Sequence, residues 1–220
     1  MMANGSDVPV RVKGAGIKIA GAEDARASVE TEASQVRRVK LSGFPPTATL
    51  SNVQSVVWGG NIQELQYQPG APIAIALFVK AEDCQKYYAA TANGIPYPSD
   101  PSKYITVEQL EPEPAHGMVK DYVEKDITRC IRVYDIDAEW GKAALTRHAQ
   151  GSGSTKRALE RVVNGQNGKG RRIADFRFAK ISDAVVFKGE LDRDIEWEAC
   201  TIKYGPDPCA LHDNVHTGML

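Results

Sequence analysis

The stretch RRIADFRF, residues 171–178, has the alternation of a β-strand that is buried on one side only. Ala174, Phe176 and Phe178 share one face, because successive side chains of a strand point to opposite sides of the sheet. The preceding GQNGKG, residues 165–170, contains the glycines that a tight hairpin turn requires, since glycine accepts a positive φ. RALERVV, residues 157–163, supplies the partner strand, so this region predicts a β-hairpin.

Segments on either side of this hairpin complete a strand–helix–strand–strand–helix–strand unit. A strand, IRVYDI, and a helix, AEWGKAALTRHAQ with Trp140 near its start, come before it. A helix with Ala184, Phe187 and Leu191 at core spacing follows, and EACTIKY, residues 198–204, forms the last strand.

The same order of elements occurs earlier in the chain. The strands are VKLSGF (39–44), NIQELQY (61–67), the segment 74–79 and KYITVEQL (103–110), and the helices are TLSNVQSVVW (49–58) and EDCQKYYAATANGI (82–95). In the second helix, Cys84, Tyr87 and Tyr88 are expected to point inward. In the third strand, we place Ala74, Ala76 and Phe78 on the open face of the sheet, where they form a shallow apolar patch with Lys40 and Thr106.

The doubled pattern predicts an α+β protein with two ferredoxin-like βαββαβ domains, each a four-stranded antiparallel sheet backed by two helices. The first domain covers residues 36–110 and the second covers residues 128–208. Residues 1–35 are expected to be a flexible N-terminal arm, and residues 209–220 a C-terminal tail. The acidic linker, residues 111–127, opens with two prolines, and its later half has the composition of a short helix.

Charge is distributed unevenly between the two halves. The chain has 27 basic and 28 acidic residues in 220, for a net charge of -1. Residues 36–110 carry 6 basic and 5 acidic side chains, whereas residues 128–203 carry 15 and 11. Because lysine and arginine supply the affinity for phosphate, any binding to nucleic acid should depend on the second half.

Several other classes of protein find no support in the sequence. No apolar run approaches the roughly 20 residues of a membrane helix, and the first residues lack the features of a signal peptide. Four scattered cysteines suggest no disulfide framework, so we expect a cytoplasmic or nuclear protein. GAGIKIAG and GSGSTKR do not match nucleotide-binding loops. No catalytic set is present, and the spacing of Cys200, Cys209, His212 and His216 matches no common zinc site, so we expect neither an enzyme nor a cofactor or metal.

The strands carry two motifs that resemble those of the RNA-recognition motif. VKLSGF and IRVYDI are similar to the hexamer of that family, and AIALFVKA (74–81) and RRIADFRF are similar to its octamer. TIKYGPDPC, residues 201–209, is also similar to the end of the last strand in fungal multi-domain regulators of the negative-regulator-of-differentiation type. The resemblance implies single-stranded RNA binding, with bases stacked on aromatic side chains of the central strands, and a role in post-transcriptional regulation of mRNA.

The resemblance places the stacking positions on Lys40, Ala76 and Phe78 in the first domain, and on Arg132, Ile173 and Asp175 in the second. Only one of the six is aromatic, so charge and hydrogen bonds would replace most of the stacking. The predicted RNA-binding residues are Lys40, Phe78, Arg132, Lys169, Arg171, Arg172, Ile173 and Lys203.

Two alternatives stay open at this point. The basic side chains could simply be solvated, and Phe78 could be covered by polypeptide, namely the linker, the N-terminal arm or a second copy of the chain. In that case the domains would bind protein, or self-associate through the first sheet face, with little or no RNA contact.

Overall fold

The computed structural model describes residues 36–112 and 118–211; the predicted N-terminal arm lies outside these ranges. The first module, which corresponds to the first predicted domain, contains a five-stranded antiparallel sheet in the order β2-β3-β1-β5-β4. Strand β4 was not predicted; it pairs with the first half of β5 and extends the sheet beyond the four expected strands. The elements are β1 (Arg38–Ser42), α2 (Leu50–Ser55), β2 (Ile62–Tyr67), β3 (Ile73–Phe78), α3 (Ala81–Ala90), β4 (Ile95–Tyr97) and β5 (Asp100–Gln109).

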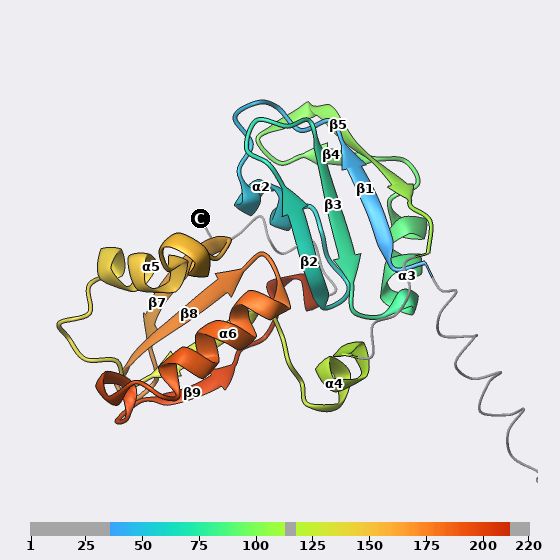
Figure 1. Cartoon of the computed structure of the whole chain (residues 1–220). Coiled ribbons are helices and arrows are strands. Elements are labelled where there is room, and N and C mark those ends of the chain that lie inside the picture. Colours follow the sequence, from blue (N-terminus) through green and yellow to red (C-terminus); the bar gives the residue numbers. More distant parts are fainter. Residues whose placement is uncertain (1–35, 113–117, 212–220) are drawn as a thin grey trace, which may run out of the picture.

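The second module has a four-stranded antiparallel sheet in the order β7-β8-β6-β9. Its elements are β6 (Cys130–Tyr134), α5 (Lys142–Gln150), β7 (Leu159–Gln166), β8 (Arg172–Phe178), α6 (Ile181–Leu191) and β9 (Thr201–Tyr204), with short 3-10 turns at Gly153–Thr155, Ile195–Trp197 and Pro208–Ala210. The predicted α+β class with two βαββαβ units is confirmed (Figure 1). Helix α4 (Met118–Glu124) occupies the later half of the predicted linker, as expected.

Local signals explain where several helices start and stop. Thr49 caps α2, and its hydroxyl accepts a hydrogen bond from the backbone of Asn52, whose side chain bonds back to the Thr49 backbone. Helix α5 ends at Gly151, whose φ of 65° lies in the left-handed region. A Cβ atom at this position would also lie only 2.5 Å from the carbonyl oxygen of Thr155, so only glycine fits.

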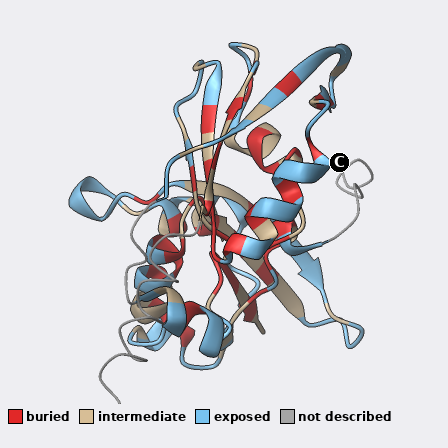
Figure 2. Cartoon of the chain, turned by 90° about the vertical axis from the view of Figure 1, so that its right-hand side faces the viewer, coloured by how far each residue is buried: buried red, intermediate tan, exposed pale blue. Residues whose placement is uncertain are grey.

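Each module buries one face of its sheet against its two helices, which Figure 2 shows as buried stretches in strands and on the helix surfaces that face them. In the second module, Phe176 and Phe178 pack against Phe187 with ring centroids 5.0 and 5.3 Å apart, which confirms the predicted core face of β8. In the first module, Phe78 packs against Tyr87 at 5.4 Å. Tyr88 was predicted to point inward as well, but it is exposed, because α3 turns only Ala81, Cys84 and Tyr87 toward the sheet.

The two modules lie side by side and share an interface (Figure 1). At the edge of the first sheet, the amide of Leu65 donates to the carbonyl oxygen of Ala179 at 2.8 Å, and Glu64 forms a β-bridge with Lys180. Helix α4 closes one side of the boundary, where Tyr122 packs with Val79 of the first module and Ile181 of the second. The edge strand β2 is therefore partly covered by the second module.

A buried ion pair forms the centre of this interface. Arg129 donates to both carboxylate oxygens of Asp207 at 2.9 and 2.8 Å, and neither side chain is exposed to solvent. Arg129 also donates to Gln54 Oε1 of α2 at 3.0 Å, and Asp207 accepts from the amide of Ile62 at 3.0 Å. One pair of charges thus connects the start of β6 and the segment after β9 with two elements of the first module.

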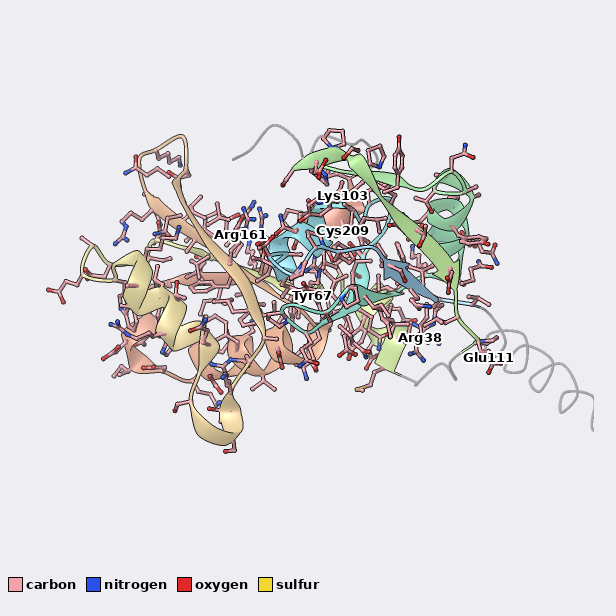
Figure 3. The ribbon with its side chains drawn as sticks, turned by 90° about the horizontal axis from the view of Figure 1, so that it is seen from above. Arg38, Tyr67, Lys103, Glu111, Arg161 and Cys209 are labelled. Atoms are coloured by element: carbon pink, nitrogen blue, oxygen red, sulfur yellow. The ribbon has the colours of Figure 1, made fainter. Side chains whose placement is uncertain are left out.

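The segment that follows β9 belongs structurally to the first module. Cys209 is fully buried in the core of that module, and its carbonyl oxygen accepts from the amide of Gly60 at 3.0 Å. Figure 3 shows Cys209 among the elements of the first module, and Arg161 on the neighbouring strand β7. The expected tail from residue 209 is therefore docked at its start, and residues 212–220 lie outside the described part of the chain.

Candidate nucleic-acid interface

The open face of the second sheet, on the side away from α5 and α6, carries several basic side chains, among them Arg132, Arg177 and Lys203. Ile131 and Val133 of β6 are buried in the core, so Arg132 and Tyr134 point to the open side. The strand register arranges the open-face side chains in three rows. They are Lys203, Arg132, Asp175 and Val163 in the first; Thr201, Tyr134, Ile173 and Gly165 in the second; and Cys130, Arg177 and Arg161 in the third.

A wide, open hollow of about 490 Å³ lies at the end of this face where Tyr134 meets the β7–β8 hairpin. The hairpin has a defined conformation, because the Asn167 side chain accepts hydrogen bonds from the amides of Lys169 and Arg171, both at 2.9 Å. Gly170 at the same turn has a φ of 73°. The hollow is lined by Tyr134, Asp135, Asn167, Gly168, Lys169, Arg171, Thr201 and Lys203.

The basic side chains of this face differ in how far they are neutralised. Lys169 and Lys203 have no ion-pair partner within residues 36–112 and 118–211. Arg171 is paired with Asp135, whose two carboxylate oxygens accept hydrogen bonds from its guanidinium. The two lysines are therefore the cations at the hollow that remain available to an anionic ligand.

Arg132 makes a bidentate contact with Asp175 across the two central strands. Its Nε and Nη2 atoms lie 2.6 and 2.7 Å from the two carboxylate oxygens. The hydrogen bond to Asp175, followed by the charge of that carboxylate, raises the pKa of the Arg132 guanidinium above its already high value. Arg132 is therefore permanently charged, but its charge is balanced within the face.

Arg172, the next basic residue of the hairpin arm, has a different environment. Its guanidinium donates to the carbonyl oxygen of Asp137, and to that of Trp140 at 2.8 Å. These contacts hold the loop between β6 and α5, so Arg172 supports the fold of the loop.

The third row of the open face leads toward the first module. Arg161 lies 2.6 Å from Glu160, which also accepts a hydrogen bond from the Ser51 hydroxyl of α2. Arg177, the cross-strand neighbour of Arg161, has no ion-pair partner in the described part of the chain. The basic surface of the second module therefore extends to the boundary between the modules.

The corresponding face of the first module has a different character. Lys40 lies 2.9 Å from Glu108, its cross-strand partner on β5, so its charge is balanced. Ile73, Ile75 and Leu77 line β3 on the open side, and Ser42 lies where the second module has Tyr134. The open-face positions of β1 and β3 hold no aromatic side chain, and the aliphatic strip along β3 offers nothing for a phosphate.

The predicted orientation of β3 is wrong by one residue. Ala74, Ala76 and Phe78 face the core, and Phe78 is 0% exposed. The error arose because both faces of this strand are apolar, so alternation alone could not decide which face meets the helices. Phe78 packs against Tyr87 in the core of its own module, so it is removed from the candidate interface.

The other predicted residues fall into three groups. Arg132, Ile173, Asp175 and Lys203 lie on the open face of the second sheet as expected, and Lys169 lies on the hairpin beside it. Lys40 lies on the open face of the first sheet, paired with Glu108. Arg171 and Arg172 lie at the hairpin but are engaged by Asp135 and by backbone carbonyl groups, respectively.

Sequence reasoning missed Tyr134, Arg161 and Arg177. The signal for two of them was present, because Tyr134 follows Arg132 by two residues and Arg177 follows Asp175 by two, which places each on the same face of its strand. Arg161 could not be placed in this way, since β7 has a bulge between Leu159 and Arg161 that shifts the alternation.

Two further features concern other kinds of site. In the ranges that the structure covers, no helix has the length and apolar character needed to cross a membrane. Within the same ranges, no group of three or more His, Cys, Asp or Glu side chains is arranged to hold a metal ion. His212 and His216, the other members of the cysteine–histidine set weighed from the sequence, lie outside the described residues.

The sheet order and the two helices on one face of each sheet are those of two ferredoxin-like βαββαβ units, the architecture that the sequence predicted. No model of a known protein family and no curated protein matches the chain.

Comparison with solved structures gives matches of low identity. The C. elegans NONO-1 homodimer is 13% identical with a TM-score of 0.30, over 78% of this chain and 64% of that one, so the match spans less than two thirds of NONO-1. The N-terminal three RNA binding domains of the yeast splicing factor Prp24 are 14% identical with a TM-score of 0.29, over 85% of this chain and 78% of that one. The Sex-lethal RNA recognition domains 1 and 2 from Drosophila melanogaster are 14% identical with a TM-score of 0.28, over 77% of this chain and 99% of that one.

Proposed function

We propose that the chain binds single-stranded RNA through the open face of its second module. One observation carries this proposal: Tyr134 lies beside Lys169 and Lys203 around an open hollow, and neither lysine has an ion-pair partner in the described residues. An aromatic ring offers a stacking surface to any base, and lysines bind the phosphates on either side of it. The charge of the second module is consistent with this role, because it holds most of the excess of basic residues.

Two finer points of the proposal rest on the sequence resemblance. We infer a role in post-transcriptional regulation of mRNA from the general resemblance to RNA-recognition motifs. A relation to fungal regulators of the negative-regulator-of-differentiation type is supported only by TIKYGPDPC at the end of β9.

The proposal is tested by measuring the affinity of the whole chain for a short, labelled, random single-stranded RNA at several salt concentrations. The double variant Lys169→Gln, Lys203→Gln is compared with Lys86→Gln, Lys103→Gln, which removes the same charge from the first module. Each lost phosphate contact lowers the slope of log K against log salt by about 0.7 on a single strand. We expect a slope lower by about 1.4 for the double variant in the second module.

The control variant should leave the slope unchanged, because Lys86 and Lys103 lie away from the hollow. An equal decrease of the slope in the two double variants would mean that RNA binding depends only on the net charge of the chain. Absence of salt-dependent binding by the unmodified chain would disprove the proposal.

A second function is favoured by the first module. Ile73 is 42% exposed on the open side of β3, and Tyr104 on β5 is 55% exposed. An aliphatic strip without free cations suits a polypeptide better than an RNA strand. We propose that this face contacts protein, including a second copy of the chain. Light scattering of the unmodified chain and of Ile73→Glu would test self-association, which the variant should weaken while its RNA affinity stays the same.

A further inference from the structure

The Arg132–Asp175 pair occupies the centre of the open face that we propose for RNA. It joins direct cross-strand neighbours on β6 and β8, the two central strands of the sheet. Two parallel hydrogen bonds of 2.6 and 2.7 Å hold the guanidinium and the carboxylate in one plane. Because the Cβ atoms of such neighbours lie only about 5 Å apart, the long arginine side chain must lie down along the sheet to reach the short aspartate.

The pair is open to solvent on one side. The Arg132 side chain is 32% exposed and that of Asp175 is 17% exposed. Val163 lies beyond Asp175 in the same row and is exposed on β7, and Tyr134 follows Arg132 in the next row. A flat, polar surface bordered by an aliphatic side chain and an aromatic side chain therefore lies where an RNA-recognition motif carries its stacking positions.

Electrostatics determines which part of an RNA strand can lie on this surface. The positive charge of Arg132 is balanced by Asp175, and the carboxylate would repel a phosphate placed directly above it. The unpaired cations lie around the pair, with Lys203 to one side of it, Lys169 at the hairpin and Arg177 in the next row. An uncharged base therefore fits the centre of the open face, above the Arg132–Asp175 pair, and the phosphates of the RNA fit its rim, near the unpaired cations.

We propose that the Arg132–Asp175 pair is a stacking platform, on which one base of the bound RNA lies flat against the paired guanidinium and carboxylate. Planar guanidinium groups stack on bases much as aromatic rings do. This inference rests on the proposed RNA binding, and assigns Arg132 the role of a planar surface in place of a phosphate contact. Lysine cannot replace it, because an ammonium group has no plane.

The test compares two ligands, an oligouridylate and an abasic sugar-phosphate oligomer of the same length and charge. Arg132→Lys keeps the charge and removes the plane. We expect it to weaken binding of the oligouridylate roughly tenfold, with an unchanged salt slope, and to leave the abasic oligomer unaffected. Lys203→Gln should do the reverse, lowering the slope by about 0.7 for both ligands.

Asp175→Asn gives a second, independent outcome. If Arg132 were a phosphate contact held back by Asp175, this variant would bind both oligomers more tightly and with a steeper salt slope. If the pair is a platform, the variant loses affinity for the oligouridylate alone, because the guanidinium is no longer held flat. Thermal unfolding of both variants, expected close to that of the unmodified chain, shows that the sheet is intact.

The possible failures are distinguishable. If the unmodified chain binds both oligomers equally well, or if Arg132→Lys weakens both by the same factor, the platform is disproved while RNA binding by charge stands. If the unmodified chain binds neither oligomer, the proposed function fails and the platform fails with it.

Discussion

Lys40 and Arg132 occupy the same place in the two modules, at the middle of the central strand and on the open face. Each is neutralised by a carboxylate, but on opposite sides. Lys40 pairs with Glu108 on β5, the last strand of the first module, whereas Arg132 pairs with Asp175 on β8, the third strand of the second module. Register places Lys203 where the first module has Glu108, and Asp175 where it has Ile75.

This exchange of partners changes the chemistry of the whole face. In the first module, Glu108 neutralises Lys40, and the neighbouring β3 side chains are Ile73, which is exposed, and Ile75, which is half-buried. In the second, the acidic residue sits at the centre and leaves Lys203 available at the edge. Two modules of one fold can thus carry different side-chain chemistry at equivalent cross-strand positions.

A second equivalent pair, Arg37 and Arg129, lies inside the molecule. Each precedes the central strand, and its carbonyl oxygen accepts from the amide of Phe78 or Phe178, respectively. Both guanidinium groups also donate to the carbonyl oxygen of that phenylalanine. Arg129 in addition pairs with the fully buried carboxylate of Asp207, and this pair joins the modules.

The largest expected effect concerns the stability that the buried Arg129–Asp207 pair provides. Asp207→Ala leaves the Arg129 guanidinium buried without its carboxylate, and removal of one partner of a buried pair costs about 3–5 kcal/mol of stability. The free energy of unfolding, measured by chemical denaturation, should fall by that amount. Asp192→Ala, which removes the exposed partner of Lys188, is the matched control and should change stability little. A small loss for Asp207→Ala would show that the interface does not hold the modules together.

The next effect concerns Tyr134, the aromatic side chain on the open face of the central strand β6. Tyr134→Ser introduces the residue that the first module carries at the equivalent position, Ser42. Loss of one stacked base should weaken binding of single-stranded RNA by about 1–3 kcal/mol, or roughly 5- to 150-fold. Fluorescence anisotropy with a labelled RNA measures this loss. The reciprocal variant Ser42→Tyr is the control, and the comparison fails if both variants bind like the unmodified chain.

The sequence predicted most of the fold for physical reasons that can be named. The β8 segment has bulky aromatic residues on one side and polar residues on the other, so its orientation was clear and was confirmed by the packing of Phe176 and Phe178. The β3 segment has apolar residues on both sides, and only contact with α3 decides that Phe78 is inside. The pattern of one strand cannot contain that information.

The interface between the modules was also beyond the reach of sequence reasoning. Arg129 and Asp207 are separated by 78 residues, and nothing in the local sequence distinguishes them from solvated charges. The candidate site was predictable in part. Arg132, Lys169 and Lys203 were expected, whereas the ion pairs that engage Arg132, Arg171 and Lys40 depend on strand register and turn geometry.

A smaller effect is expected from giving the first module the basic side chain that the second module has on its last strand. Glu108→Lys frees Lys40 and gives the first module the residue that the second has at Lys203. Each new phosphate contact should steepen the salt dependence of RNA binding by about 0.7, with a modest rise in affinity. Glu82→Lys makes the same charge change on the exposed side of α3 and is the control. Equal gains from the two variants would show that only net charge matters.

The smallest expected effect is a difference in acid sensitivity between the modules. His148 is the only histidine within residues 36–112 and 118–211, and it lies on α5. Its ring stacks on Trp197 at 5.6 Å, and its Nε2 atom is buried without a hydrogen-bond partner in the described residues. Burial lowers the pKa of His148, an effect that Asp194 partly opposes and Arg157 reinforces.

A depressed histidine pKa stabilises the fold above the unfolded value of about 6.5, and this stability is lost as pH falls through the folded value. We therefore expect the thermal midpoint of the unmodified chain to decrease below about pH 6.5, before most carboxylates titrate. His148→Phe keeps an aromatic ring in the stack and removes the titrating group, so its midpoint should fall less over the same range. Tryptophan fluorescence reports on the event directly, because Trp140 and Trp197 both pack against His148. Parallel curves for the two proteins between pH 8 and 5 would mean that the acid response arises from other groups, and that the modules do not differ in this respect.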